Sequence, residues 1–106
     1  MELKKRRLGR TNLMVAELGL GAMDTPQSKE GAPTVHHALD LGVTFVDTAR
    51  EYEGSEYLIG EVLRERRIKD CYLGTKSFNR TRDGVQYEVD KSLNILGVDQ
   101  IDLYQL

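Results

Sequence analysis

The stretch LDLGVTFVD, residues 39 to 47, decides the fold class of this chain. It has the pattern of a helix end, a tight Leu-Gly-Val corner and a short apolar strand that ends on an acid, Asp47. The stretch LNILGVDQIDL, residues 93 to 103, repeats this arrangement further along the chain. Strands that alternate with helices pair in parallel through right-handed crossovers. The repeat therefore predicts an α/β fold with a parallel sheet.

The rest of the chain continues the alternation. Apolar runs that suit buried strands occur roughly 30 residues apart, at 15–23, 44–47, 71–76 and 101–106. Three helical patterns lie between them. The first covers 33–41 with Pro33 in its first turn, and the second covers 55–64 with Ser55 as its N-cap. The third follows a cap at Thr81 or Asp83 and ends at Gly97.

The pattern predicts part of a barrel. Residues 6–16 favour a β-hairpin, βα units follow over about 17–100, and the fourth strand covers 101–106. A repeat of ~30 residues is typical of a (β/α)8 TIM barrel of ~250 residues. We therefore predict one α/β domain over residues 1–106, which contains the N-terminal hairpin and roughly the first half of a (β/α)8 barrel.

Composition excludes several classes of protein. With 40 % hydrophobic and 30 % charged residues the chain is globular, and a net charge of −2 gives no general attraction to nucleic acid or anionic membranes. No apolar run approaches the ~20 residues of a membrane helix, and the N-terminus lacks a signal-peptide core. The single cysteine, Cys71, permits no internal disulfide and suits a small buried side chain better than a nucleophile. We expect a cytoplasmic protein.

Two local clusters carry little functional information. The basic run at residues 4–7 suits a solvated edge strand better than a binding patch. His36 and His37 lie on the first predicted helix, where we expect them to be exposed or half-buried. Because no cysteine or carboxylate accompanies them at ligand spacing, no metal site is predicted.

Three ionisable residues fall where the chemistry of a parallel α/β fold is found. Asp47 ends the second strand, Tyr52 lies in the loop after it, and Lys76 ends the third strand. The carboxyl ends of parallel strands meet at one edge, so these side chains should form one cluster. A lysine ammonium favours the phenolate of a neighbouring tyrosine and an aspartate can hold that lysine in place. Such a phenol can protonate a carbonyl oxygen as hydride reaches the carbon.

Each residue also has a structural explanation when it is taken alone. Asp47 could accept hydrogen bonds from loop backbone, Tyr52 could cover the rim of the barrel, and Lys76 could be a surface lysine after a strand. The position of all three at strand ends favours the functional interpretation.

At these residues the chain resembles the N-terminal part of the aldo-keto reductases. The matching stretches are RRLGRTNLMVAELGLGAM, ALDLGVTFVDTAREYEGSE, LGTKS and LGVDQIDLYQL, which cover nearly the whole chain. The resemblance implies a (β/α)8 barrel, NADP(H) as cofactor and reduction of aldehydes and ketones. It further implies that Asp47, Tyr52 and Lys76 belong to the catalytic tetrad, and that Gly21, Ala22, Met23 and Asp47 lie against the cofactor.

The chain also departs from the family pattern. Tyr52-Glu53-Gly54 replaces the usual Tyr-Gly pair, and the histidine of the tetrad would come directly after Leu106. The expectation is a reductase whose 106 residues need the rest of the barrel for activity. Two alternatives stay open: a non-catalytic half-barrel that self-associates through its open sheet edges, and a nucleotide-binding regulatory relative.

Overall fold

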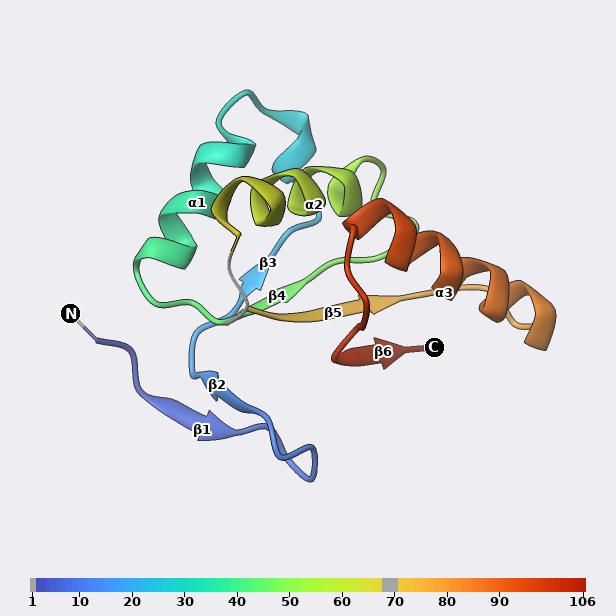
Figure 1. Ribbon diagram of the computed structural model, residues 1–106, viewed down its shortest axis with the longest axis horizontal. Helices are drawn as coiled ribbons and strands as arrows, with labels where there is room; N and C mark the ends of the chain where they lie inside the picture. The colour runs from blue at the N-terminus through green and yellow to red at the C-terminus, as the bar shows by residue number, and fades with distance from the viewer. Residues whose placement is uncertain (1, 68–70) are drawn as a thin grey trace.

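The computed structural model describes residues 2–67 and 71–106 and contains two sheets (Figure 1). In chain order its elements are β1 (Lys5–Arg7), β2 (Met14–Ala16), β3 (Leu20–Gly21), the 3-10 helix η1 (Thr25–Gln27), α1 (Gly31–Asp40), β4 (Phe45–Asp47), α2 (Ser55–Arg66), β5 (Tyr72–Lys76), α3 (Arg82–Leu96) and β6 (Leu103–Gln105). β1 and β2 form the antiparallel hairpin. The other four strands form a parallel sheet in the order β3-β4-β5-β6.

All three α-helices lie on the same side of the parallel sheet (Figure 1). Side chains alternate along a strand, so one set faces the helices and the other faces away. In β4, Val46 is fully buried whereas Phe45 and Asp47 are partly exposed. The core between sheet and helices consists of Ala22, Val35, Val46, Ile59, Val62, Leu73 and Leu96. Burial of each larger apolar side chain contributes roughly 1.5–3 kcal/mol to folding.

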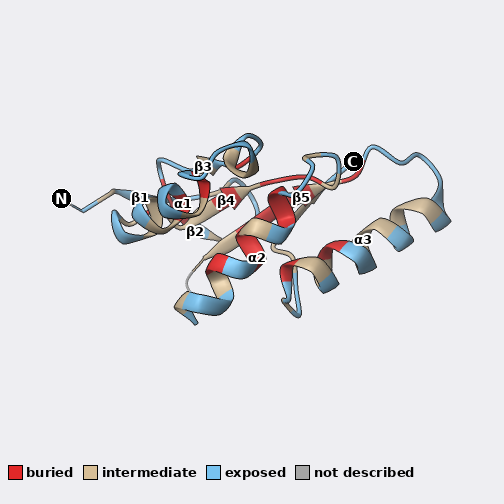
Figure 2. Cartoon of the chain, turned by 90° about the horizontal axis from the view of Figure 1, so that it is seen from above, coloured by how far each residue is buried: buried red, intermediate tan, exposed pale blue. Residues whose placement is uncertain are grey.

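Buried residues gather along α2 and the strands beneath it (Figure 2). Leu58, Ile59, Val62 and Leu63 form an apolar stripe along α2, and two of them, Ile59 and Val62, are almost completely buried. Gly60, also on α2, lies where this helix packs against α3. A Cβ atom at this position would lie 2.7 Å from the carbonyl oxygen of Ile95 and 3.0 Å from that of Leu96. The two helices therefore approach closely because this residue has no side chain.

The hairpin predicted over 6–16 ends where β2 does, at Ala16, but the first buried strand, predicted over 15–23, is wrong in its extent. Val15 and Ala16 belong to the hairpin strand β2, and only Leu20 and Gly21 pair with β4. The chain bends at Glu17, whose N–H donates to the carbonyl of Lys4 at 2.8 Å. The first two residues of the apolar run at 15–23 therefore belong to the hairpin. Apolar character alone could not show where one strand would divide between two sheets.

The helices differ from the predictions mainly at their beginnings. α1 begins at Gly31, so Pro33 is its third residue. η1 was not predicted. For α3 the sequence was a better guide: Thr81 is the N-cap and its hydroxyl accepts from the N–H of Gly84 at 3.0 Å, while Gly97 follows the last turn. The longest helix of the described residues, α3, has 15 residues, fewer than the ~20 that a bilayer crossing requires.

Candidate active site

The structure brings Asp47, Tyr52 and Lys76 together at the carboxyl ends of β4 and β5. The Lys76 ammonium donates to Asp47 Oδ2 at 3.0 Å and to the carbonyl of Thr48 at 2.7 Å. It also lies 4.8 Å from the centroid of the Tyr52 ring. The side chain of Lys76 is only 16 % exposed, so these contacts replace most of the water around its charge. The lysine is therefore held between a carboxylate and the face of a phenol.

Backbone hydrogen bonds hold the loop after β4 against β5. The N–H of Thr48 donates to Gly74 at 2.8 Å and the N–H of Arg50 donates to Lys76 at 3.0 Å, so parallel pairing continues beyond the end of the strand. A turn follows, in which the N–H of Tyr52 donates to Ala49 at 3.3 Å. Tyr52 is thus only two residues from a backbone position that is bonded to Lys76 itself.

Gly74 has no side chain, and this leaves room for the carboxylate of Asp47 beside the strand. It pairs in register with Asp47 across β4 and β5. A Cβ atom on Gly74 would lie 3.3 Å from Asp47 Oδ1 and 2.8 Å from Cζ of Phe45. Glycine at this position therefore allows the carboxylate and the ring to lie over the strand and leaves Asp47 within reach of Lys76.

The predicted role of Ser55 as an N-cap is wrong. The N-cap is Gly54, with φ of 80°, and Ser55 is the first residue of α2. The fully buried Ser55 hydroxyl donates to the carbonyl of Ala22 at 2.8 Å. Its single proton is then used, so it accepts from the Thr48 hydroxyl 2.6 Å away. Ser55 joins the start of α2 to the ends of β3 and β4 because the helix begins directly above both strands.

The residues expected near a cofactor differ in accessibility. Gly21 ends β3 next to Asp47 and has open space on its Cβ side, and Met23 is 51 % exposed. Ala22 is completely buried, its N–H donates to Asp47, and its carbonyl accepts from Ser55 and Thr25. Gly21, Met23 and Asp47 are thus exposed to a ligand at this edge. Ala22 is not, and its backbone instead connects the end of β3 to Asp47, Thr25 and Ser55.

Sequence reasoning missed a buried ionic network beside the cluster. The Glu56 carboxylate, only 3 % exposed, accepts from Arg50 Nη1 at 2.6 Å, from the Thr75 hydroxyl at 2.8 Å and from the Ser92 hydroxyl. Arg50 Nε also donates to Glu88 at 2.6 Å. Burial alone would lower the pKa of Arg50, but its hydrogen bonds to Glu56 and Glu88 and their charges raise it.

One sequence signal could have revealed this network. Glu56 precedes Ile59 and Gly60 by three and four residues, which places it on the buried face of α2. A carboxylate within an apolar stripe requires a cationic or hydrogen-bonding partner.

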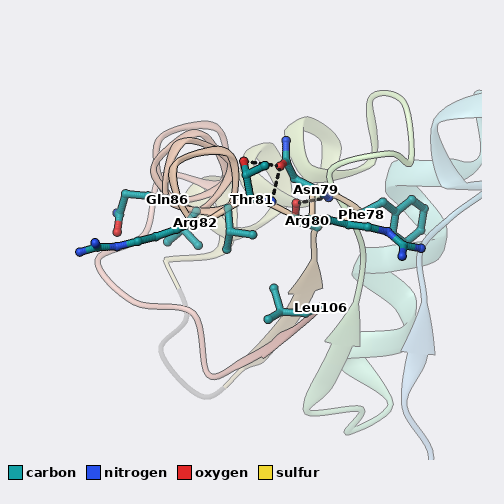
Figure 3. A pocket seen from close by; sticks show the side chains of 10 residues that line it. Phe78, Asn79, Arg80, Thr81, Arg82, Gln86 and Leu106 are labelled. Atoms are coloured by element: carbon teal, nitrogen blue, oxygen red, sulfur yellow. Dashed lines mark hydrogen bonds between the residues drawn. The ribbon is translucent and has the colours of Figure 1, made fainter.

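Hollows lie on both sides of the cluster at this edge of the sheet. The groove next to Tyr52 has a volume of about 660 Å³ and is lined by Met23, Asp24, Pro26, Gln27, Glu51, Tyr52 and Glu53. A larger cavity, about 850 Å³, lies between the β5–α3 loop, α3 and Leu106 (Figure 3). On its wall Asn79 accepts from Thr81 and donates its backbone N–H to the Ser77 hydroxyl. Its described lining includes Arg80 and Arg82 but not Tyr52 or Lys76. Of these two hollows, it is the groove that a residue of the Asp47–Tyr52–Lys76 cluster lines.

Cys71 and the two histidines lie outside this cluster. Burial, and secondarily the charge of Asp102, raises the pKa of the Cys71 thiol to about 11, so it stays protonated at neutral pH. His36 is half-buried and His37 exposed, as expected. His36 Nδ1 faces Arg66 at 3.3 Å and Nε2 faces Glu65 at 3.1 Å. Because arginine only donates, Nδ1 accepts and Nε2 carries the proton.

Comparison with known proteins places this geometry in a family. The model of the Aldo/keto reductase family matches residues 17–106. The chain is 36 % identical over 119 residues to the uncharacterized oxidoreductase YqkF of Bacillus subtilis, covering 98 % of this chain and 39 % of that protein. It is 37 % identical over 103 residues to the aldo-keto reductase yakc [NADP(+)] of Schizosaccharomyces pombe, covering 82 % of this chain and 30 % of that protein.

Solved structures agree with the fold. The holo form of aldo-keto reductase AKR11C1 from Bacillus halodurans superposes with a TM-score of 0.86 and 35 % identity, covering 98 % of this chain and 40 % of that structure. The chain thus spans about 30 to 40 % of the length of these relatives. Their (β/α)8 barrel confirms the predicted fold class, with this sheet and its helices as the N-terminal part. The chain belongs to the aldo/keto reductase family of oxidoreductases.

Proposed function

We propose that these residues form the catalytic edge of an NADP(H)-dependent reductase that converts aldehydes and ketones to alcohols, acting together with the remainder of the barrel in a longer chain. The observation that carries the proposal is the position of the Lys76 ammonium, 3.0 Å from Asp47 and 4.8 Å from the Tyr52 ring. The substrate is a small carbonyl compound that enters beside Tyr52.

Tyr52 acts as the general acid in this proposal. Its hydroxyl gives a proton to the carbonyl oxygen while the carbonyl carbon accepts hydride, and the phenolate that remains is stabilised by the positive charge of Lys76. Asp47 balances that charge and fixes the lysine beside the ring. In the direction of alcohol oxidation, the phenolate takes the proton back.

The cofactor would lie along the ends of β3 and β4. Gly21 and Met23 offer exposed surface there, and Asp47 is 37 % exposed while it still binds Lys76. A reduced nicotinamide supplies the hydride when it is bound. NADP(H) is favoured because the yakc relative carries NADP(+) in its name and the AKR11C1 structure is a holo form.

The proposal is tested by Tyr52→Phe in the full-length protein, with reduction of a small aldehyde followed through NADPH absorbance. Loss of the general acid should lower kcat by about 10² to 10⁴. The dissociation constant of NADPH, measured by fluorescence quenching, should change less than about twofold, since the ring and Lys76 remain.

Tyr57→Phe is the matched control, because it removes the same atom from an exposed phenol on the neighbouring helix α2. It should keep the activity of the unmodified protein. Turnover at the original rate in Tyr52→Phe would refute Tyr52 as the acid.

A further inference from the structure

Arg50 and Glu56 close the two ends of the segment that carries Tyr52. Arg50 comes two residues before Tyr52 and Glu56 four residues after it. Arg50 Nη1 donates to Glu56 Oε1 at 2.6 Å, so a charged hydrogen bond spans the segment from its first residue to its last. Bonds of this kind are roughly twice as strong as neutral ones. The conformation of the segment is thus fixed by its own side chains.

The same pair is anchored to the strand that carries Lys76. Glu56 accepts from the hydroxyl of Thr75, the residue directly before Lys76, at 2.8 Å. The backbone N–H of Arg50 donates to the carbonyl of Lys76 at 3.0 Å. Each end of the Tyr52 segment therefore contacts β5 within one residue of the lysine, one through backbone and one through a buried carboxylate.

Helix α3 completes the anchor from the other side. The fully buried Ser92 hydroxyl donates to Glu56, and Arg50 Nε donates to Glu88 at 2.6 Å. The Arg50 guanidinium is thus shared by two helices, and two hydroxyls and one guanidinium satisfy Glu56. A buried carboxylate with these partners has one low-energy position, because any shift would break charged hydrogen bonds at a carboxylate that is only 3 % exposed.

We infer that Arg50 and Glu56 are positioning residues, which set the distance between the Tyr52 phenol and the Lys76 ammonium. The inference rests on the proposed function, since only a reaction at Tyr52 would depend on that distance. Neither residue touches the reacting atoms. A displacement of about 1 Å between reacting groups can cost on the order of 10² in rate, so a loosened segment should lower kcat.

The test is Arg50→Met in the full-length protein. It removes both ion pairs and retains an unbranched side chain. We expect kcat to fall by about 10- to 100-fold, with the NADPH dissociation constant changed less than about twofold. Arg50→Lys, which keeps one charge but not the bidentate geometry, should recover part of the loss.

Arg66→Met is the matched control. Arg66 is the last residue of α2, its side chain is 22 % exposed like that of Arg50, and it pairs with Asp40 of α1 at 2.7 Å, at the opposite end of α2 from Tyr52. It should leave kcat unchanged. If Arg66→Met lowered kcat as much as Arg50→Met, the effect would be general destabilisation and the positioning role would be refuted.

A double variant separates positioning from stability. If Arg50 acts only through Tyr52, adding Arg50→Met to Tyr52→Phe should lower kcat less than about twofold further. A full additive loss would overturn the inference. Failure of the proposed function is a different outcome, since Tyr52→Phe alone would then retain its turnover.

A spectroscopic readout does not depend on turnover. With fluorotyrosine incorporated, the Tyr52 ¹⁹F resonance, assigned through Tyr52→Phe, should shift or broaden in Arg50→Met and not in Arg66→Met. An unchanged resonance together with an unchanged kcat would overturn the inference.

Should Arg50→Met fail to fold, Glu88→Gln replaces it, because it weakens only the hydrogen bond from Arg50 Nε to Glu88. It should then show a smaller change of the same kind, and no change in either readout would count against the inference.

Discussion

Asp47 and Lys76, which are 29 residues apart in sequence, form an ion pair of 3.0 Å across the ends of β4 and β5. The side chain of Lys76 is mostly buried and that of Asp47 partly exposed. The ammonium of the lysine is therefore held in position by one carboxylate, one carbonyl and one aromatic ring.

Replacing Lys76 should remove most catalysis. In the proposed mechanism Lys76→Met removes the charge that stabilises the Tyr52 phenolate, and kcat should fall by about 10² to 10⁴. Asp47→Asn should have a smaller effect in the same direction because Lys76 keeps its bond to Thr48. The matched control is Lys91→Met, since Lys91 lies 5.8 Å from the ring of the exposed Tyr87 on α3. Equal rates for Lys76→Met and the unmodified protein in steady-state assays would contradict this prediction.

Gly74→Ala should disturb the active site more than the fold. The new methyl would lie 2.8 Å from Cζ of Phe45 and 3.3 Å from Asp47 Oδ1, so both side chains must move away from their present positions. A displaced carboxylate holds Lys76 less well, and we expect kcat to fall by about tenfold. Adding Phe45→Leu should restore part of the rate by making room for the methyl. If the double variant has no higher kcat than Gly74→Ala alone, the steric explanation is wrong.

Gly60→Ala should destabilise the fold although alanine is the better helix former by about 1 kcal/mol. The added Cβ would meet the carbonyl oxygens of Ile95 and Leu96, which belong to backbone and cannot rotate away. Separating α2 from α3 should lower the free energy of unfolding by about 1–3 kcal/mol, measured by urea denaturation. Glu61→Ala, at the neighbouring exposed position, should change it by less than about 0.5 kcal/mol. A stabilised Gly60→Ala protein would show that the helices can separate without cost.

Stability should fall at alkaline pH partly because of Cys71. Burial raises the pKa of its thiol from 9.0 to about 11 in the folded state. Below pH 9 the thiol is protonated in both the folded and the unfolded chain, and its full contribution to the free energy of unfolding is present. Between pH 9 and 11 the unfolded chain loses the proton first, so the free energy of unfolding decreases, by up to about 1.4 kcal/mol per pH unit. Urea titrations over this range should show a shallower decrease for Cys71→Ala, and parallel curves for the two proteins would rule out this contribution.

The elements of the fold could be predicted where short-range patterns specify them. The Leu-Gly-Val corner before β4, the apolar stripe of α2 and the Thr81 cap of α3 each depend on residues within a few positions of one another. The placement of Asp47 and Lys76 at strand ends followed from the same patterns. Their meeting could be expected because parallel strands share an edge.

The sequence by itself thus determined the order of strands and helices and the edge at which the ionisable residues gather. Only the tertiary structure decided that just Leu20 and Gly21 of the run at residues 15–23 join the parallel sheet, that Ser55 bonds Ala22, and that Glu56 is buried against Ser92. The physical reason is distance along the chain. The partners of Ser55 and Glu56 include residues 33 and 36 positions away, and these come within bonding range only after the crossovers have placed the helices on the sheet.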